Sequence, residues 1–278
     1  MEVKSTAEQL FFTTVRIDTV DQEGKTGAGT GFIFIHPYKE RQYPFIVTNK
    51  HVMKDTVKGG ITFIKKEGGT AKLGDAFRLE VDNFENMWFG HKDPDIDIAV
   101  APLAPLEQHI KELGVEIFYR NINTKLIPNE ETLKEIDALE DVVFIGYPNG
   151  IWDSKNFIPI MRKGITATPI QIDFEGKRMF LIDASVFGGS SGSPVFIYNS
   201  GTYATKGGPT KVGTRLHFIG VVASVYYRNE INEIVYVPIP TDDKPVTIGK
   251  EMIDLGIVYK ANTVPEAIEQ FVNEKEKS

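Results

Sequence analysis

Short runs in which apolar and polar residues alternate recur along most of the chain. Residues 10–17, Leu-Phe-Phe-Thr-Thr-Val-Arg-Ile, are an example, and they are rich in β-branched and aromatic side chains. Alternation with a period of two is typical of strands that have one buried face. Comparable runs occupy residues 31–35, 43–48, 61–65, 76–81, 97–103, 141–147, 157–168, 178–183, 195–198, 216–225 and 234–239. The pattern predicts a chain dominated by strands.

Helical spacing is confined to a few segments. Residues 103–113 carry apolar side chains at helical intervals, and residues 264–272 do the same after a proline that suits an early helix position. We expect a short helix at each place, the second one packing back on the strand-rich body. Residues 114–140 are mixed and acidic, with a helix start at 128–131. We expect this segment to connect two halves of the molecule.

Composition narrows the class of protein. The chain has 278 residues, 41% hydrophobic and 25% charged, which is ordinary for a globular protein. A formal net charge of −7 argues against a general nucleic-acid surface. The chain has no cysteine, no signal-peptide-like apolar segment at its start and no apolar run of about 18 residues. We therefore expect a cytoplasmic protein with neither a membrane nor a nucleic-acid partner.

One loop between two predicted strands is rich in glycine and serine, Phe187-Gly-Gly-Ser-Ser-Gly-Ser-Pro194. Glycine lets the backbone bend and lets a substrate carbonyl approach closely. Successive N–H groups in such a turn can point into one concavity and bind a developing oxyanion. Ser191, flanked by small residues, is therefore a candidate nucleophile. The same composition is also typical of an ordinary hairpin loop.

A serine nucleophile needs a base that takes its proton and a carboxylate that orients the base. His51 follows an apolar strand that ends in Thr-Asn-Lys, and Asp97 opens an alternating apolar stretch. The competing base is His91, which we expect in a polar loop with no strand to fix it. The competing acid is Asp95, which shares a face with Asp97 if the chain is extended there. We prefer His51 because a strand delivers it.

Three segments resemble motifs of the trypsin/chymotrypsin-like serine proteases. They are Val-Thr-Asn-Lys-His51-Val, Asp97-Ile-Ala-Val and Gly-Ser-Ser191-Gly-Ser-Pro. The resemblance is strongest to the disulfide-free bacterial branch that contains the HtrA-type proteases and the glutamyl endopeptidases. The order His, Asp, Ser is that of chymotrypsin and differs from the subtilisin and α/β-hydrolase orders. The motif register favours Asp97 over Asp95 as the acid.

The resemblance implies an all-β fold. Two six-stranded antiparallel β-barrels would hold the active site between them, and a short C-terminal helix would follow. The implied parts are an N-terminal barrel with the histidine and the aspartate (1–115), an inter-barrel connection (116–140), a C-terminal barrel with the serine (141–245) and a helical tail (246–278).

The resemblance also implies the chemistry, which is hydrolysis of peptide bonds through an acyl-enzyme. Ser191 would be the nucleophile, His51 the base and Asp97 the group that orients it. The N–H groups of Gly189 and Ser191 would form the oxyanion hole. This mechanism uses no cofactor and no metal, and we expect neither. The expected partner is a protein or peptide substrate.

Specificity is less well determined by the sequence. The resemblance places the substrate pocket at Ser185, Val186, Val222, Ala223 and Ser224. Ser185 stands where trypsins carry an aspartate, and Val222 stands where glutamyl endopeptidases carry a histidine. Neither a basic nor an acidic preference is supported, so we expect a small or medium apolar pocket. Ser190 replaces the aspartate that pairs with a newly cleaved N-terminus in zymogen-type relatives, and we expect no maturation of that kind.

Two other glycine-rich segments lack the context of nucleotide-binding loops. A β-run rather than a helix follows residues 27–31, and residues 207–211 lack the Gly-Lys-Ser/Thr order of a phosphate-binding loop. We expect residues 199–213 to form a surface hairpin insertion. His36, at the end of the run after the first segment, is expected on the surface.

Three alternatives to a constitutively active protease stay open. The first is a catalytically silent binding module on the same fold. The second is an intracellular effector that needs an activating protein partner to order the Ser191 loop. The third is an esterase that uses the same three side chains. The presence of all three candidate residues weighs against the silent module.

Overall fold

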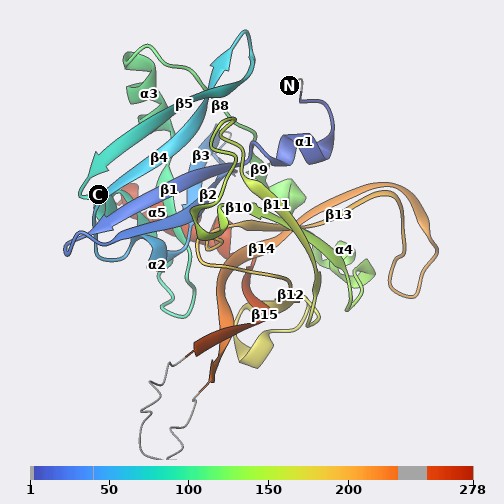
Figure 1. The fold of residues 1–278 in the computed structure, drawn as a ribbon. Coiled ribbons are helices and arrows are strands. Elements are labelled where there is room, and N and C mark those ends of the chain that lie inside the picture. The colour runs from blue at the N-terminus through green and yellow to red at the C-terminus, as the bar shows by residue number, and fades with distance from the viewer. Residues whose placement is uncertain (1–2, 40, 231–248, 278) are drawn as a thin grey trace, which may run out of the picture.

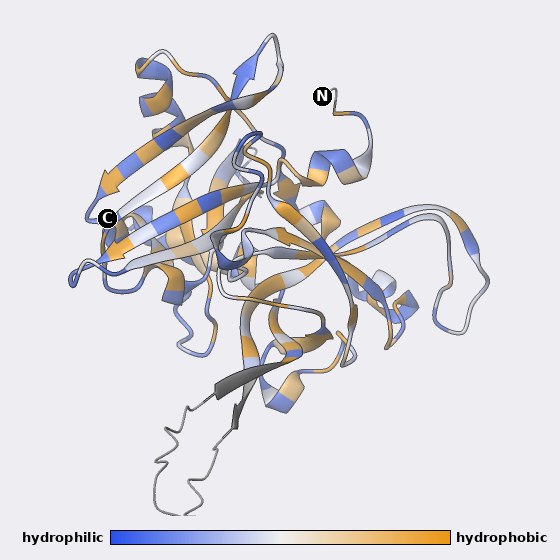
Figure 2. Cartoon of the chain, viewed as in Figure 1, coloured by the Kyte–Doolittle hydropathy of each residue, from blue (hydrophilic) through white to orange (hydrophobic). Residues whose placement is uncertain are grey.

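The computed structural model of the protein describes residues 3–39, 41–230 and 249–277. Strands dominate both halves of the chain, and the two halves lie side by side (Figure 1). Hydrophobic residues are concentrated along the strands of both halves (Figure 2). The mostly-β fold expected from the alternating pattern is therefore confirmed. The strand predicted at residues 234–239 lies outside the described residues.

The first half of the chain forms a sheet with the strand order β5-β4-β1-β2-β3-β7-β6, to which β8 adds beside β4 and β9 beside β2. The β2–β9 pair is parallel, and the other pairs are antiparallel. The strands are β1 (Thr14–Asp21), β2 (Thr26–Tyr38), β3 (Arg41–Thr48), β4 (Thr56–Glu67), β5 (Thr70–Asp82), β6 (Phe89–Gly90), β7 (Ala99–Pro102), β8 (Ile117–Phe118) and β9 (Ile122–Asn123).

The second half forms a closed antiparallel barrel with the order β10-β11-β12-β15-β14-β13. Its strands are β10 (Asp141–Gly146), β11 (Ile160–Thr166), β12 (Met179–Asp183), β13 (Pro194–Tyr203), β14 (Lys211–Glu230) and β15 (Gly249–Lys260). Two barrels of six strands each are not confirmed. In the first half, the two-residue strands β6, β8 and β9 add to the sheet and give it nine strands.

Short helices lie between the strands. The α-helices are α1 (Thr6–Leu10), α2 (Lys50–Met53), α3 (Ala104–Glu112), α4 (Glu130–Glu135) and α5 (Thr263–Lys275). The 3₁₀ helices are η1 (Phe84–Met87), η2 (Thr124–Leu126), η3 (Pro148–Gly150) and η4 (Phe174–Gly176). The helices predicted near 103–113, 128–131 and 264–272 are thus confirmed. Within the described ranges, no helix is long and apolar enough to cross a membrane.

The predicted insertion at residues 199–213 is a hairpin, as expected. Strands β13 and β14 stay paired out to Tyr203 and Lys211, and together they project from the barrel (Figure 1). The Nζ atom of Lys211 lies 2.7 Å from the carboxylate of Glu135 at the end of α4. The hairpin is therefore fastened to the connecting segment near its turn.

Aromatic side chains join the two halves into one core. The ring of Phe218 on β14 lies 5.4 Å from that of Phe32 on β2 and 5.7 Å from that of Phe196 on β13. All three side chains are fully buried. Burying a phenylalanine side chain contributes about 1.5–3 kcal/mol. Loops from the two halves are held against each other by this shared core.

Helix α5 follows the last strand of the barrel but packs on the first sheet. The ring of Phe271 lies 5.7 Å from that of Phe45 on β3 and 5.8 Å from that of Phe89 on β6, both edge-on. Ile268 of the same helix is fully buried in the shared core. The predicted tail helix therefore bridges the two halves.

The helix also covers two histidines, His36, which was expected on the surface, and His91, which was expected in a polar loop. His36 and His91 are each only 5% exposed. The Nδ1 atom of His91 accepts a hydrogen bond from the N–H of Asp93, and its Nε2 lies 3.6 Å from the carboxylate of Glu266 on α5. The surface position predicted for His36 and the unfixed loop predicted for His91 are wrong, because a helix distant in sequence packs over both.

These two histidines make the stability of the fold sensitive to acid. Burial lowers the pKa of both imidazoles below the ordinary value, and nearby glutamates oppose the shift only in part. The unfolded chain therefore binds more protons than the folded one as the pH falls below about 6.5. The neutral histidines therefore contribute fully to the free energy of unfolding above that pH. This contribution is lost as the pH falls through their lowered pKa values.

We expect the Tm to fall between about pH 7.5 and pH 5.5, and to fall less in the variant that carries both His36→Gln and His91→Gln. Differential scanning fluorimetry across this range measures the slope. His109→Gln, at an exposed position on α3, is the matched control and should keep the wild-type slope. An equal slope in the double variant would contradict the prediction.

Candidate active site

The pairing of β3 with β7 brings His51 and Asp97 to the same edge of the first sheet. Thr48, the last residue of β3, is the register partner of Ala99, the first residue of β7. His51 lies three residues beyond the end of β3, in the first turn of α2, and Asp97 lies two residues before β7. Because the strands are antiparallel, the chain leaves one and enters the other at this edge.

The carboxylate of Asp97 holds His51 at two points. Its Oδ2 lies 2.5 Å from the Nδ1 of His51, and its Oδ1 accepts a hydrogen bond from the His51 backbone N–H at 3.1 Å. The Nδ2 of Asn49 donates to the carbonyl oxygen of Asp97 at 2.6 Å. A carboxylate can only accept, so in the neutral imidazole the proton is on Nδ1, and Nε2 on the far side of the ring is left as an acceptor.

Ser191, from the second half of the chain, lies next to His51 and extends the line of side chains that begins at Asp97. It lies in the loop between β12 and β13, and its Oγ is 2.9 Å from the Nε2 of His51. The carbonyl oxygen of Ala223 on β14 lies 3.1 Å from the same Oγ. The hydroxyl therefore has two acceptors within reach, the imidazole and a backbone carbonyl. The structure thus brings together the three side chains singled out in the sequence.

Asp95 does not share a face with Asp97. The N–H of Asp95 donates to the Oδ1 of Asp93, and the N–H of Ile96 donates to the carbonyl of Asp93, so the chain turns here before the strand begins. Asp95 is exposed, and its carboxylate lies 3.9 Å from the Nζ of Lys177. The extended conformation assumed for residues 95–97 is wrong, because this local turn ends only at Ile96.

Gly192 is required where it stands, directly after the serine. Its φ of +86° lies in the left-handed region, and a Cβ at this position would overlap the carbonyl oxygen of Thr30. The N–H of Gly192 donates to the carbonyl of Val222 at 2.8 Å. The serine loop therefore packs directly against the backbone of both β2 and β14.

Two hydrogen bonds fix the peptide planes on either side of Gly189. The carbonyl of Gly188 accepts from the N–H of Asn149, and the carbonyl of Gly189 accepts from the Oγ1 of Thr30 at 2.9 Å. In a trans peptide the N–H points opposite to the preceding carbonyl, so the N–H of Gly189 points away from Asn149. Sequence analysis did not single out Thr30 or Asn149; a lone polar residue in a glycine-rich β-run was the only signal for Thr30.

The N–H of Ser191 is oriented in a similar way. The carbonyl of Ser190 accepts from the N–H of Ser193 at 2.9 Å, which turns the N–H of Ser191 in the opposite direction. Within the described part of the chain, neither this N–H nor that of Gly189 donates to a protein acceptor. Both donors are thus free to bind an external oxygen atom.

The residues expected around the substrate pocket differ in exposure. Val186 and Val222 are buried in the core of the barrel, and Ala223 is 3% exposed. Ser185 and Ser224 are exposed. Ala223 contacts the site through its carbonyl oxygen, as described above. The assignment of these residues to a specificity pocket stays a prediction.

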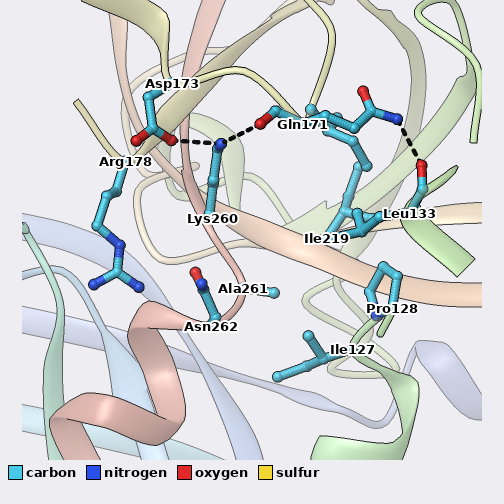
Figure 3. A pocket seen from close by; sticks show the side chains of 11 residues that line it. Ile127, Pro128, Leu133, Gln171, Asp173, Arg178, Ile219, Lys260, Ala261 and Asn262 are labelled. Carbon is cyan, nitrogen blue, oxygen red and sulfur yellow. Dashed lines mark hydrogen bonds and ion pairs between the residues drawn. The ribbon is translucent and has the colours of Figure 1, made fainter. Parts of the chain in front are cut away.

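A pocket of about 320 Å³ lies on another part of the barrel, lined by residues of β14, β15, the connection and the segment between β11 and β12 (Figure 3). Its charged groups are already paired. The Nζ of Lys260 lies 2.5 Å from the carboxylate of Asp173, and Arg178 forms a bidentate pair with Glu266. We assign this pocket no role in the chemistry. Among the described residues, no group of acidic and histidine side chains is arranged to hold a metal ion.

Comparison with known proteins places the chain in a family. The sequence model of the trypsin-like peptidase domain matches residues 29–202, which include His51, Asp97 and Ser191. No curated protein sequence matches the chain.

Several solved structures are similar in fold. The Rv3671c protease of M. tuberculosis in its active form is 17% identical over 94% of this chain and 81% of its own, with a TM-score of 0.44. The thermostable serine protease AL20 from an extremophilic microorganism is 12% identical over 92% and 95%, with a TM-score of 0.47. The catalytically inactive tobacco etch virus protease complexed with substrate is 11% identical over 98% and 87%, with a TM-score of 0.48.

These structural likenesses carry no functional argument at such identities. The family match does not depend on them, since it covers more than half of the 278 residues. The chain belongs to the trypsin-like peptidase family.

Proposed function

We propose that the protein is a serine endopeptidase that cleaves peptide bonds through an acyl-enzyme. One observation carries the proposal, the hydrogen-bonded row from Asp97 through His51 to Ser191, with distances of 2.5 and 2.9 Å. A nucleophile, a base within reach of it and a carboxylate that orients the base are the parts that acyl transfer to serine requires.

In the first half of the reaction, the Oγ of Ser191 attacks the carbonyl carbon of the scissile peptide bond. The Nε2 of His51 takes the hydroxyl proton, and Asp97 stabilises the imidazolium that forms. The tetrahedral intermediate then collapses, the C–N bond breaks, and His51 gives its proton to the leaving amine. The product of this half is an ester between Ser191 and the acyl part of the substrate.

In the second half, water replaces the amine. His51 takes a proton from the water molecule as its oxygen attacks the ester carbon, and the second tetrahedral intermediate collapses with the proton returned to Ser191. The free carboxylic acid leaves, and the row of three side chains is restored.

The free N–H groups of Gly189 and Ser191 are the proposed oxyanion donors. Each is aimed by a neighbouring carbonyl that is itself hydrogen-bonded. Donors that are fixed before the reaction stabilise the developing charge without reorganising, and loss of one such donor typically lowers kcat by about 10²–10³-fold.

Covalent labelling by a fluorophosphonate probe tests the proposal. We expect the purified wild-type protein to gain one probe adduct, located at Ser191 by peptide mass spectrometry, because the probe reports an activated serine. Ser191→Ala should abolish labelling. Ser200→Ala, which changes an exposed serine on the projecting hairpin, should leave labelling unchanged. A folded wild-type protein that remains unlabelled would contradict the proposal and would favour the silent binding module or the effector that needs an activating partner.

A further inference from the structure

Within the described residues, the guanidinium of Arg162 donates hydrogen bonds only to the loop that carries Ser191. The Arg162 side chain extends from β11, where its Nη1 donates to the carbonyl of Ser185 at 2.7 Å and its Nη2 donates to the Oγ of Ser190 at 2.7 Å. Ser190 is fully buried, and it directly precedes the candidate nucleophile. The guanidinium thus connects the two ends of the segment 185–190, which contains Gly189.

The acceptor on Ser190 is also part of a tight turn. The N–H of Ser190 donates to the carbonyl of Phe187 at 3.0 Å, and the N–H of Phe187 lies 3.3 Å from the Oγ of Ser190. Arg162 therefore holds a turn that is already closed by its own backbone, and it fixes that turn relative to strand β11. A shift of this turn would move the N–H groups of both Gly189 and Ser191.

The guanidinium of Arg162 is withdrawn from solvent rather than lying free on the surface. The guanidinium lies 4.4 Å above the ring of Phe144, and within the described residues no carboxylate pairs with it. Burial lowers its pKa to about 10, so it remains a cation at neutral pH. A cation removed from water without a counter-ion is costly. Here its two directed hydrogen bonds both go to the serine loop.

We propose that Arg162 is a positioning residue that holds the oxyanion-forming loop in its active geometry without proteolytic maturation and without an activating partner. It takes the place of the aspartate and N-terminal amine that perform this task in zymogen-type relatives. The cation again lies on the partner segment, here as the permanent charge of Arg162 on β11, and the residue before the nucleophile accepts through a neutral hydroxyl instead of a carboxylate. This inference rests on the proposed peptidase function and removes the need for the gated effector considered above.

The kinetic test compares Arg162→Met, Arg162→Lys and the control Lys163→Met, which removes an exposed cation from the next position of the same strand. We expect Arg162→Met to lower kcat/KM for a peptide substrate by about 10²-fold, mostly through kcat, because small displacements of catalytic groups cost about that much. Arg162→Lys should recover only part of the loss, since an ammonium lacks the planar fork that reaches both acceptors.

Two further measurements separate positioning from general damage to the fold. Affinity for a peptidyl boronate, which places an oxygen among the oxyanion donors, should fall in Arg162→Met, whereas KM should change little. In a double-mutant cycle, Ser190→Ala should add little to the loss already caused by Arg162→Met, because both changes remove the same contact. An Arg162→Met variant within about twofold of wild type in kcat and boronate affinity would overturn the proposal.

Hydrogen exchange tests the clamp independently of activity. The amide of Ser190 is hydrogen-bonded within the loop and that of Gly192 to Val222 on β14, so their exchange reports how often the loop opens. We expect faster exchange in Arg162→Met and wild-type exchange in Lys163→Met. Unchanged exchange in Arg162→Met would refute the clamp. If wild-type protein is not labelled at Ser191, the peptidase proposal fails, whereas the exchange result still decides the role of Arg162.

Discussion

Ser191→Ala and His51→Ala should each lower kcat for peptide hydrolysis by about 10⁶-fold, the scale found when either member of such a pair is removed. Without Oγ no acyl-enzyme can form, and without the imidazole the hydroxyl proton has no acceptor at 2.9 Å. The two side chains act as a unit. The double variant should therefore be no slower than either single variant, within experimental error.

Steady-state kinetics with a fluorogenic peptide measures these changes. Both variants should keep the Tm of the wild type within a few degrees, because the His51 side chain is about half exposed and Ser191→Ala removes a single oxygen atom. His109→Ala removes an exposed histidine far along the first half and should keep full activity. Strictly additive losses in the double variant would show that the two residues act in separate steps, against the proposed mechanism.

The chemistry-bearing residues were predictable because each follows from local sequence. His51 and Asp97 lie just outside the apolar runs that form β3 and β7. Ser191 lies in a loop where Gly189 and Gly192 adopt the left-handed backbone that glycine favours. Strand alternation likewise indicated most of the strands. These patterns are local, because each depends only on residues close to the predicted strand or loop in the sequence.

Contacts between distant segments could not be predicted in this way. Arg162 and Ser190 are 28 residues apart in the sequence. Gln270 of α5, which contacts His91, is 179 residues away from it. An arginine in a strand usually has its charged end in solvent, so no local pattern predicted that Arg162 contacts the loop that carries Ser191. The nine-stranded first sheet escaped prediction for a related reason, because strands of two residues carry no alternation.

The site depends on contacts that cross between the two halves of the fold. The base and the acid come from the first sheet, and the nucleophile comes from the barrel. Thr30 on β2 joins them, since its N–H donates to the carbonyl of Ser191 at 2.9 Å and its hydroxyl donates to the carbonyl of Gly189. Thr30 fixes the loop that carries Ser191 relative to β2, and Arg162 fixes it relative to β11. The distance between base and nucleophile is therefore set by the shared core rather than by the loop alone.

The acid is tested by Asp97→Asn, for which we expect kcat to fall by about 10⁴-fold. An amide at this position keeps an oxygen for the His51 backbone N–H, so the geometry should persist. Its NH₂ group then faces Nδ1 and donates to it. The imidazole proton must move to Nε2, which becomes a donor towards Ser191 and can no longer take the hydroxyl proton.

The matched control is Asp95→Asn, which removes the same charge two residues away at an exposed position. It should leave kcat within about twofold of wild type, since an exposed ion pair contributes little. Comparing kcat for the two variants with a fluorogenic peptide therefore distinguishes tautomer control from a general effect of negative charge near His51. If both variants lose activity equally, the charge of the segment matters rather than the contact between Asp97 and Nδ1, and the assignment of Asp97 as the orienting acid fails.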